Sequence, residues 1–174
     1  MGASEDDYVG TFEKAASRNF LDAERLRRGN RSLGAIYHYG YCVEMLVKAA
    51  YFRMAFPVAQ PPLPLATTRI DSGRRRQAVR ETDAQGNRLV PNDFGPHDFK
   101  NWALLLTRKR ALLAATDPVV VYDPALANEI RDRADRVYGY WKEYIRYRSF
   151  PVRAGELAIV RGDADWFRRN YPSL

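Results

Sequence analysis

The chain has 174 residues, of which 46% are hydrophobic, and its 28 Lys and Arg outnumber 21 Asp and Glu, giving a formal net charge of +7. This length suits a single domain, residues 1–174, that buries its own core without disulfide or metal cross-links. One cysteine and two histidines are too few for zinc-site spacings, so we expect neither a metal nor a cofactor. No segment resembles a secretory signal or reaches the ~20 apolar residues of a membrane span, which favours a cytoplasmic protein without membrane contact.

The first part of the chain predicts two antiparallel helices. Apolar residues recur at steps of three and four in residues 11–28 and again in residues 31–53, where Ile36, Val43 and Val47 lie on one face. Gly29-Asn30 stops the first helix, and so short a connection places the two helices in an antiparallel hairpin.

Residues 57–96 interrupt the helical pattern, and we call them the insert. The insert begins with PVAQPPLPL, whose prolines favour an extended path. Within residues 73–91, two runs of mixed polar and apolar residues flank the segment DAQGN, which predicts a small β-hairpin. Because the insert lacks the apolar period of the helices, we expect it to lie outside the core.

Three further helices are expected at residues 97–115, 128–148 and 156–170, and the second of these has an alternative start at Pro124, since proline suits a first turn. The predicted fold is therefore all-α, an antiparallel bundle of four or five helices with the hairpin insert between the second and the third helix.

Glu44 lies at the border of the apolar face of the second helix. A carboxylate placed there needs a cationic partner, because its desolvation is costly. We expect Arg146, in an aromatic run of the fourth helix, to form this structural ion pair. The alternative is that Glu44, Lys48, Arg146 and Tyr147 line a nucleotide pocket in which guanidinium holds phosphate and rings stack on a base.

The insert also carries the strongest sign of an anionic partner. Five of its arginines form a cluster, Arg69, Arg74, Arg75, Arg76 and Arg80, and each guanidinium is able to neutralise one phosphate of RNA or of a nucleotide. A solvated, charged hairpin without a ligand is the alternative interpretation.

Four segments, GAIYHYGYCVEMLVKA, GPHDFKNW, WKEYIRYRS and VRAGELAIVRGDADWF, resemble in order four segments of the HEPN (higher eukaryotes and prokaryotes nucleotide-binding) domains. The resemblance covers most of residues 12–170 apart from the insert. It implies a helical bundle that binds RNA or nucleotide, forms a homodimer and has a nucleotidyltransferase or an antitoxin as partner.

Catalytic members of that family are metal-independent ribonucleases in which four to six residues separate an Arg from a His near the start of the last core helix. The pair with this spacing here is Arg31 and His38, which lies on the second helix, and the fourth helix has no histidine. We therefore expect a non-catalytic protein that binds RNA or nucleotide. The alternatives are a toxin-class endoribonuclease that uses Arg31 and His38, and a purely structural dimerisation domain.

Overall fold

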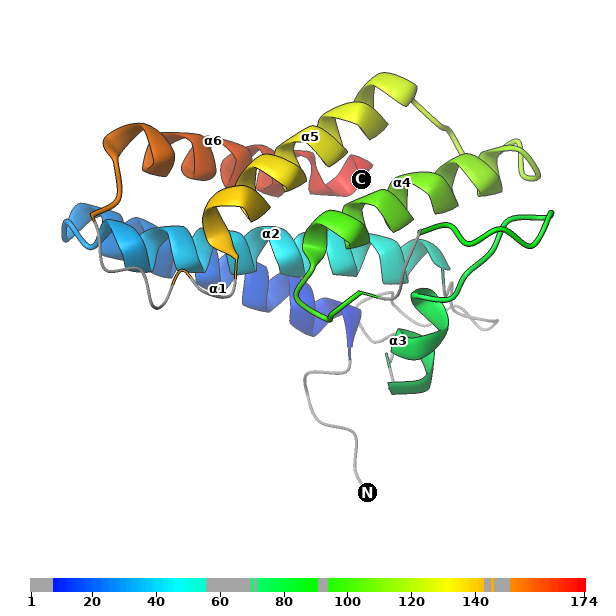
Figure 1. Cartoon of the computed structure of the whole chain (residues 1–174), viewed down its shortest axis with the longest axis horizontal. Helices are drawn as coiled ribbons and strands as arrows, with labels where there is room; N and C mark the ends of the chain where they lie inside the picture. The colour runs from blue at the N-terminus through cyan, green and yellow to red at the C-terminus, as the bar shows by residue number, and fades with distance from the viewer. Residues whose placement is uncertain (1–7, 56–69, 71, 91–93, 143–144, 146–150) are drawn as a thin grey trace.

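The computed structural model describes residues 8–55, 70, 72–90, 94–142, 145 and 151–174 (Figure 1). The helices are α1 (Val9–Arg28), α2 (Ser32–Ala55), α3 (Ser72–Ala78), α4 (Phe99–Ala114), α5 (Pro124–Trp141), α6 (Ala154–Asn170) and the short 3-10 helix η4 (Tyr171–Ser173). The predicted all-α class is confirmed. In the described part of the chain, no helix combines the length and the apolarity needed to cross a membrane.

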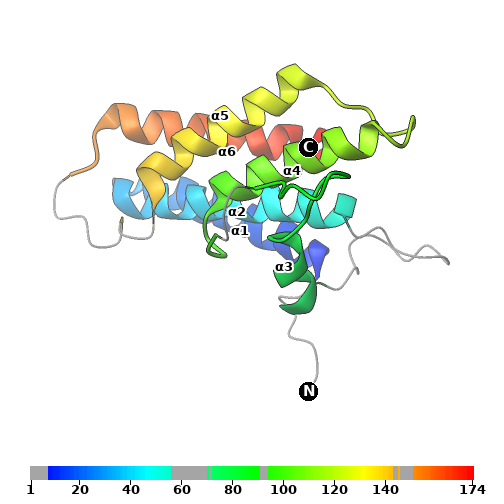
Figure 2. The ribbon, with the colours of Figure 1, turned by 45° about the vertical axis from the view of Figure 1, so that its right-hand side comes forward.

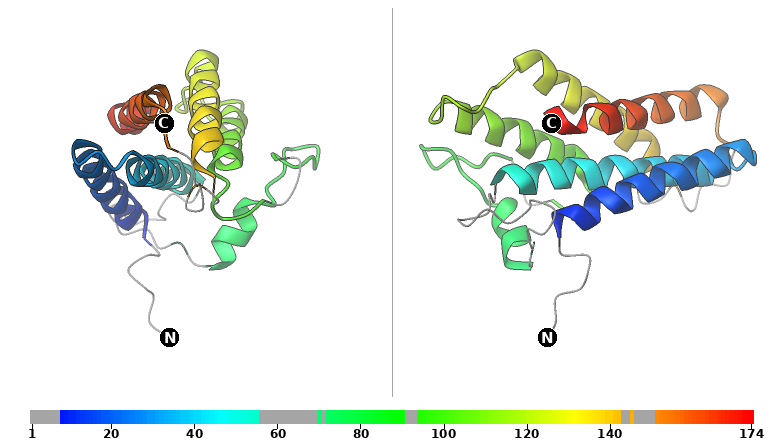
Figure 3. Two further views of the ribbon diagram at one scale, coloured as in Figure 1. Left: turned by 60° about the vertical axis from the view of Figure 1, so that its left-hand side comes forward. Right: turned by 180° about the vertical axis from the view of Figure 1, so that it is seen from behind.

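Helix α2 is the centre of the molecule. It packs against α1, α4, α5 and α6, and the end-on view in Figure 3 shows it between α1 on one side and α4 and α5 on the other. Its buried residues extend around the helix, because Tyr39, Cys42 and Leu46 are covered in addition to the predicted stripe. A helix that is apolar all round belongs in the interior, so the single predicted face accounts for only part of the buried surface.

The turn between α1 and α2 closes at the predicted position. Asn30 has a φ of 57°, a left-handed conformation that Asn tolerates better than most residues. The Arg31 backbone N–H donates to the Leu26 carbonyl oxygen at 2.8 Å. This reversal makes α1 and α2 antiparallel (Figure 1).

Aspartate side chains define where two later helices begin. Asp123 accepts hydrogen bonds from the backbone N–H groups of Ala125 and Leu126 at 2.8 and 3.3 Å, so α5 starts at Pro124. Asp98 accepts from Asn101 at 3.2 Å and caps α4. His97, which we expected in the first turn of that helix, therefore lies in the loop before it.

The two strands of the β-hairpin predicted at residues 73–91 are not present in the described structure. Ser72–Ala78 forms α3, and the described residues contain no strand but one isolated antiparallel bridge between Thr82 and Arg88. The reversal itself is present, because Gly86 has a φ of +82° and Asp83 accepts from the backbone of Asn87 at 2.8 Å. The run before it is Arg, Gln and Ala, which are good helix formers without β-branched side chains.

The expectation that the insert lies outside the core is also wrong. Ile70, Ala78, Leu89 and Val90 are buried and belong to the same hydrophobic cluster as the long helices. The side chain of Arg108 on α4 donates to the Leu89 carbonyl oxygen at 2.7 Å. Figure 2 shows α3 below the long helices, away from the axis of the bundle.

Gly40 on α2 is expected to tolerate no side chain. A Cβ atom added there would overlap the indole of Trp141, whose Nε1 donates to the Tyr37 carbonyl oxygen at 2.9 Å. Gly40→Ala should therefore lower the free energy of unfolding by about 1–3 kcal/mol, as overpacking does. Gly139→Ala on α5 is the matched control, because that position has open space and should gain about 0.5–1 kcal/mol from helix propensity. Denaturant melts in which the two variants change stability equally would contradict this packing.

The buried residues of the insert lead to a second prediction. Leu89→Ala should cost about 3 kcal/mol of unfolding free energy, because it removes a side chain from the packed core. Val119→Ala, at a side chain that is 84% exposed, should change stability by no more than about 0.5 kcal/mol. Urea denaturation measures both, and a neutral Leu89→Ala would restore the view that the insert lies outside the core.

Candidate binding pocket

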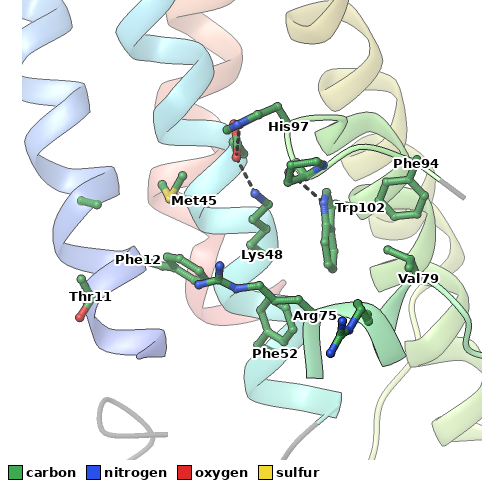
Figure 4. Close-up of a pocket in the computed structure, with 14 residues that line it drawn as sticks. Thr11, Phe12, Met45, Lys48, Phe52, Arg75, Val79, Phe94, His97 and Trp102 are labelled. Atoms are coloured by element: carbon green, nitrogen blue, oxygen red, sulfur yellow. Dashed lines mark hydrogen bonds and ion pairs between the residues drawn. The ribbon is translucent and has the colours of Figure 1, made fainter. Parts of the chain in front are cut away.

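A cavity of about 640 Å³ opens where α1, α2, α3 and the start of α4 meet (Figure 4). Its ionisable lining residues are Glu44, Lys48, Arg75, Arg76 and His97. Its aromatic lining residues are Phe12, Phe52, Phe94 and Trp102. Polar groups of both signs and several rings therefore converge on one cavity, which is the usual composition of a small-ligand site.

Glu44 forms the buried floor of this pocket. Its side chain is completely covered, and it accepts a hydrogen bond from the Lys48 ammonium at 2.5 Å. The Nδ1 atom of His97 lies 3.1 and 3.2 Å from the two carboxylate oxygens. The predicted need of Glu44 for a cation is met by Lys48, one helical turn further along α2. Arg146, the partner expected from the sequence, lies outside the described residues, as does Tyr147.

Lys48 is the cation that the fold buries most deeply in the pocket. Its side chain is 10% exposed, and its ammonium nitrogen lies 5.7 Å from the centroid of the Trp102 ring. One N–H group is used by Glu44, and the other two meet no acceptor in the described part of the chain. A buried ammonium group with unused donors gains free energy when a ligand brings acceptor oxygens to it.

His97 was not predicted to belong to a binding site. The loop that carries it is held by α4, because Trp102 Nε1 donates to the Pro96 carbonyl oxygen at 3.2 Å. Tyr41 on α2 packs edge-on against the imidazole, with ring centroids 6.2 Å apart. Since Glu44 and His97 are 53 residues apart, no local sequence pattern connects them.

The predicted arginines of the insert are divided by the structure. Arg75 and Arg76 line the pocket from α3, and Arg75 reaches toward Phe12 on α1 (Figure 4). Arg74 and Arg80 are not among the lining residues. Arg69 lies outside the described residues. The pocket therefore brings together three of the predicted ligand-binding cations: Lys48, Arg75 and Arg76.

Arg31 and His38 lie in different surroundings. The Nδ1 atom of His38 is 2.8 Å from Asn19 Oδ1, a hydrogen bond between α2 and α1. Arg31 is exposed and lines a separate hollow with residues 30–34, Pro151 and Val152. His38 lines neither this hollow nor the large pocket. The described structure thus does not bring the pair together in one cavity.

A second carboxylate that sequence analysis missed joins three helices. Glu24 on α1 accepts from Tyr39 on α2 at 2.5 Å and from Arg161 on α6 at 2.7 Å, and Arg27 binds its other oxygen at 2.9 Å. Burial alone would raise the pKa of Glu24, but these hydrogen bonds outweigh it and lower the pKa to about 2. Burial and the hydrogen bond to Glu24 raise the pKa of Tyr39 in turn.

Within the described residues, no three His, Cys, Asp or Glu side chains are grouped so that they could hold a metal ion. Comparison with protein-family models gives no match for this chain, and comparison with curated proteins and with solved structures gives no significant one.

The Glu24 cluster predicts a pH-dependent contribution to stability. Because the pKa of Glu24 is lower in the folded state than its ordinary value of 4.5, ionised Glu24 stabilises the fold above pH 4.5, and this contribution is lost as the pH falls toward about 2. Glu24→Gln should cost about 2 kcal/mol at pH 7 and progressively less below pH 4.5. Asp135→Asn is the control, because its exposed pair with Lys100 at 3.7 Å contributes little at any pH. Denaturant melts with the same Glu24→Gln effect at pH 7 and pH 2.5 would rule this mechanism out.

Proposed function

We propose that the chain is a HEPN-like helical-bundle protein that binds a nucleotide, free or within RNA, in the pocket between α1, α2, α3 and α4, and that it does not cleave RNA. The observation that carries this proposal is Lys48. Its ammonium group is buried at the pocket and keeps two N–H donors without an acceptor in the described part of the chain.

The charge of the pocket favours a phosphate as the group bound there. Three cationic side chains, Lys48, Arg75 and Arg76, line the cavity with one carboxylate, Glu44. Glu44 is engaged by Lys48 and His97. Because the lining holds three cationic side chains and one carboxylate, its net charge is positive, which favours an anion. Arginine is well suited to phosphate, because its planar fork makes two parallel hydrogen bonds.

The rings and the size of the pocket favour a base attached to that phosphate. A volume of about 640 Å³ falls within the range of small-molecule sites, roughly 300–1,000 Å³. Phe12, Phe52, Phe94 and Trp102 offer aromatic surface to the same cavity, and nucleobases stack on such rings. A nucleotide uses the cationic and the aromatic walls together, whereas inorganic phosphate uses only the first.

The non-catalytic part of the proposal is supported by the placement of Arg31 and His38, which line no common cavity. The family resemblance supports a homodimer and a nucleotidyltransferase or antitoxin as partner. The single cysteine, which cannot form an intrachain disulfide, supports a cytoplasmic location. Neither alternative function draws on the pocket. A ribonuclease built on Arg31 and His38 would act elsewhere. A structural domain would need Lys48 to neutralise Glu44 but would have no use for the cavity beside it.

Isothermal titration with adenosine monophosphate tests the binding site. Lys48→Met removes a charged hydrogen-bond donor, which is worth about 1.5–3 kcal/mol, so affinity should fall roughly 10- to 100-fold. Because Lys48→Met alone strands the buried Glu44, the decisive variant is Glu44→Gln with Lys48→Met, which removes both charges and should keep a cooperative melt. Lys14→Met, an exposed lysine on α1 that does not line the pocket, is the control and should bind as the parent does.

The same experiment separates the proposal from its rivals. A folded double variant that binds adenosine monophosphate as tightly as the parent would refute the pocket. Incubation of the parent and of His38→Ala with a mixed RNA pool tests the catalytic claim, and cleavage that disappears in His38→Ala would overturn it.

A further inference from the structure

A second hollow of about 580 Å³ lies between α1 and α6, away from the pocket described above. Four arginines line it, Arg25 and Arg28 from α1 and Arg161 and Arg168 from α6, against two acidic residues, Glu24 and Asp165. We call this hollow the α1–α6 groove. Its lining carries an excess of positive charge, and none of its residues contributes to the nucleotide pocket.

The groove follows the axis of α1. Its lining residues on that helix run from Ser17 to Arg28, and the eleven steps between these two residues rise roughly 16 Å along an α-helix. Within this length Leu21, Arg25 and Arg28 recur at steps of four and three, so they lie on one side of the helix. The groove therefore matches about three turns of a helix or about five residues of an extended strand.

Three of its four arginines already have a partner in the fold. Arg25 donates to Asp22 at 2.9 Å, although its side chain stays exposed. Arg161 donates to Glu24 at 2.7 Å, and Arg168 pairs with Asp165 at 2.9 Å while it lies 5.0 Å from the centroid of the Phe20 ring. Two lining residues differ. Arg28 has no hydrogen bond or ion pair in the described part of the chain. Leu21 is 58% exposed, although it is a large apolar side chain.

We infer that the α1–α6 groove binds an acidic, leucine-containing segment of a partner polypeptide. Carboxylates of that segment pair with Arg28 and with the exposed Arg25, and an apolar side chain of the partner covers Leu21. This binding site is separate from the nucleotide pocket, so the inference does not rest on the proposed function.

A polypeptide fits this groove better than an RNA strand does. Single-stranded RNA gains much of its binding free energy by stacking bases on aromatic side chains. The ring of Phe20 is nearly buried and lies beneath the Arg168 guanidinium, which leaves it unavailable for a base. An exposed leucine between cations instead suits a partner that alternates carboxylates with aliphatic side chains.

Fluorescence anisotropy of the full chain with a labelled twelve-residue peptide tests the inference at 150 mM salt, where weak long-range attraction is largely screened. In the probe, leucine recurs every third or fourth position and glutamate fills the rest. A peptide with glutamine in place of glutamate should bind at least tenfold more weakly. Leu21→Ser and Arg28→Ser should each weaken the acidic peptide at least fivefold while the thermal transition stays unchanged, since both side chains are exposed.

Arg31→Ser is the matched control, because Arg31 is an exposed arginine three residues from Arg28 and lines a different hollow. It should leave peptide binding unchanged. Absence of saturable peptide binding, or equal weakening by Arg31→Ser, would overturn the inference. A twelve-nucleotide uridine RNA that binds more tightly than the peptide and depends on Arg28 would assign the groove to nucleic acid instead.

Discussion

Burial of one carboxylate in the central helix constrains the arrangement around it. Glu44 is completely covered on α2, and without partners its charge would cost several kcal/mol. Lys48 supplies the neutralising charge from the same helix. His97 reaches the carboxylate from a loop 53 residues away, which fixes where the chain must pass before α4 begins. The pocket forms where Glu44, Lys48 and His97 meet. The contacts that stabilise the buried carboxylate therefore also set the geometry of the candidate site.

Two further carboxylates hold α6 against its neighbouring helices. Glu24 binds Tyr39 and Arg161, which ties α1 to α2 and α6. Asp163 on α6, whose side chain is 5% exposed, accepts from Arg133 and Arg136 on α5 at 2.6 and 2.9 Å. Each of these charged residues on α6 has a specific partner on another helix. If α6 moved along its axis, it would leave buried charges unpaired and would also lose apolar contacts. Helix α6 is thus fixed in register on two sides.

Sequence patterns within single segments predicted the helices. Contacts between segments that are distant in the sequence could be seen only in the structure. Helical periodicity and turn residues placed α1, α2 and α6 within about two residues of their observed ends, because those signals depend on near neighbours. The reversal at residues 83–87 was also predicted. The residues before it form α3 and not the predicted strand, because they favour a helix. Lys48, Arg75 and Arg76 were selected by charge and share one pocket. The Glu44–His97 contact was not predicted, because the sequence around Glu44 gives no sign of His97 and the sequence around His97 gives no sign of Glu44.

One wall of the pocket comes from the insert, which is separated from α1 and α2 by a long stretch of chain. Arg75, Arg76 and Val79 line the cavity, and their segment is anchored to the core through Ala78, Leu89 and Val90. The α1–α2 hairpin needs only a tight turn to form, whereas this wall requires closure of a long loop, which is the slower kind of step. A ligand that touches both Lys48 and Arg75 binds only the docked arrangement, so its free energy of binding is added to that arrangement. Binding of a ligand should consequently slow amide hydrogen exchange in α3.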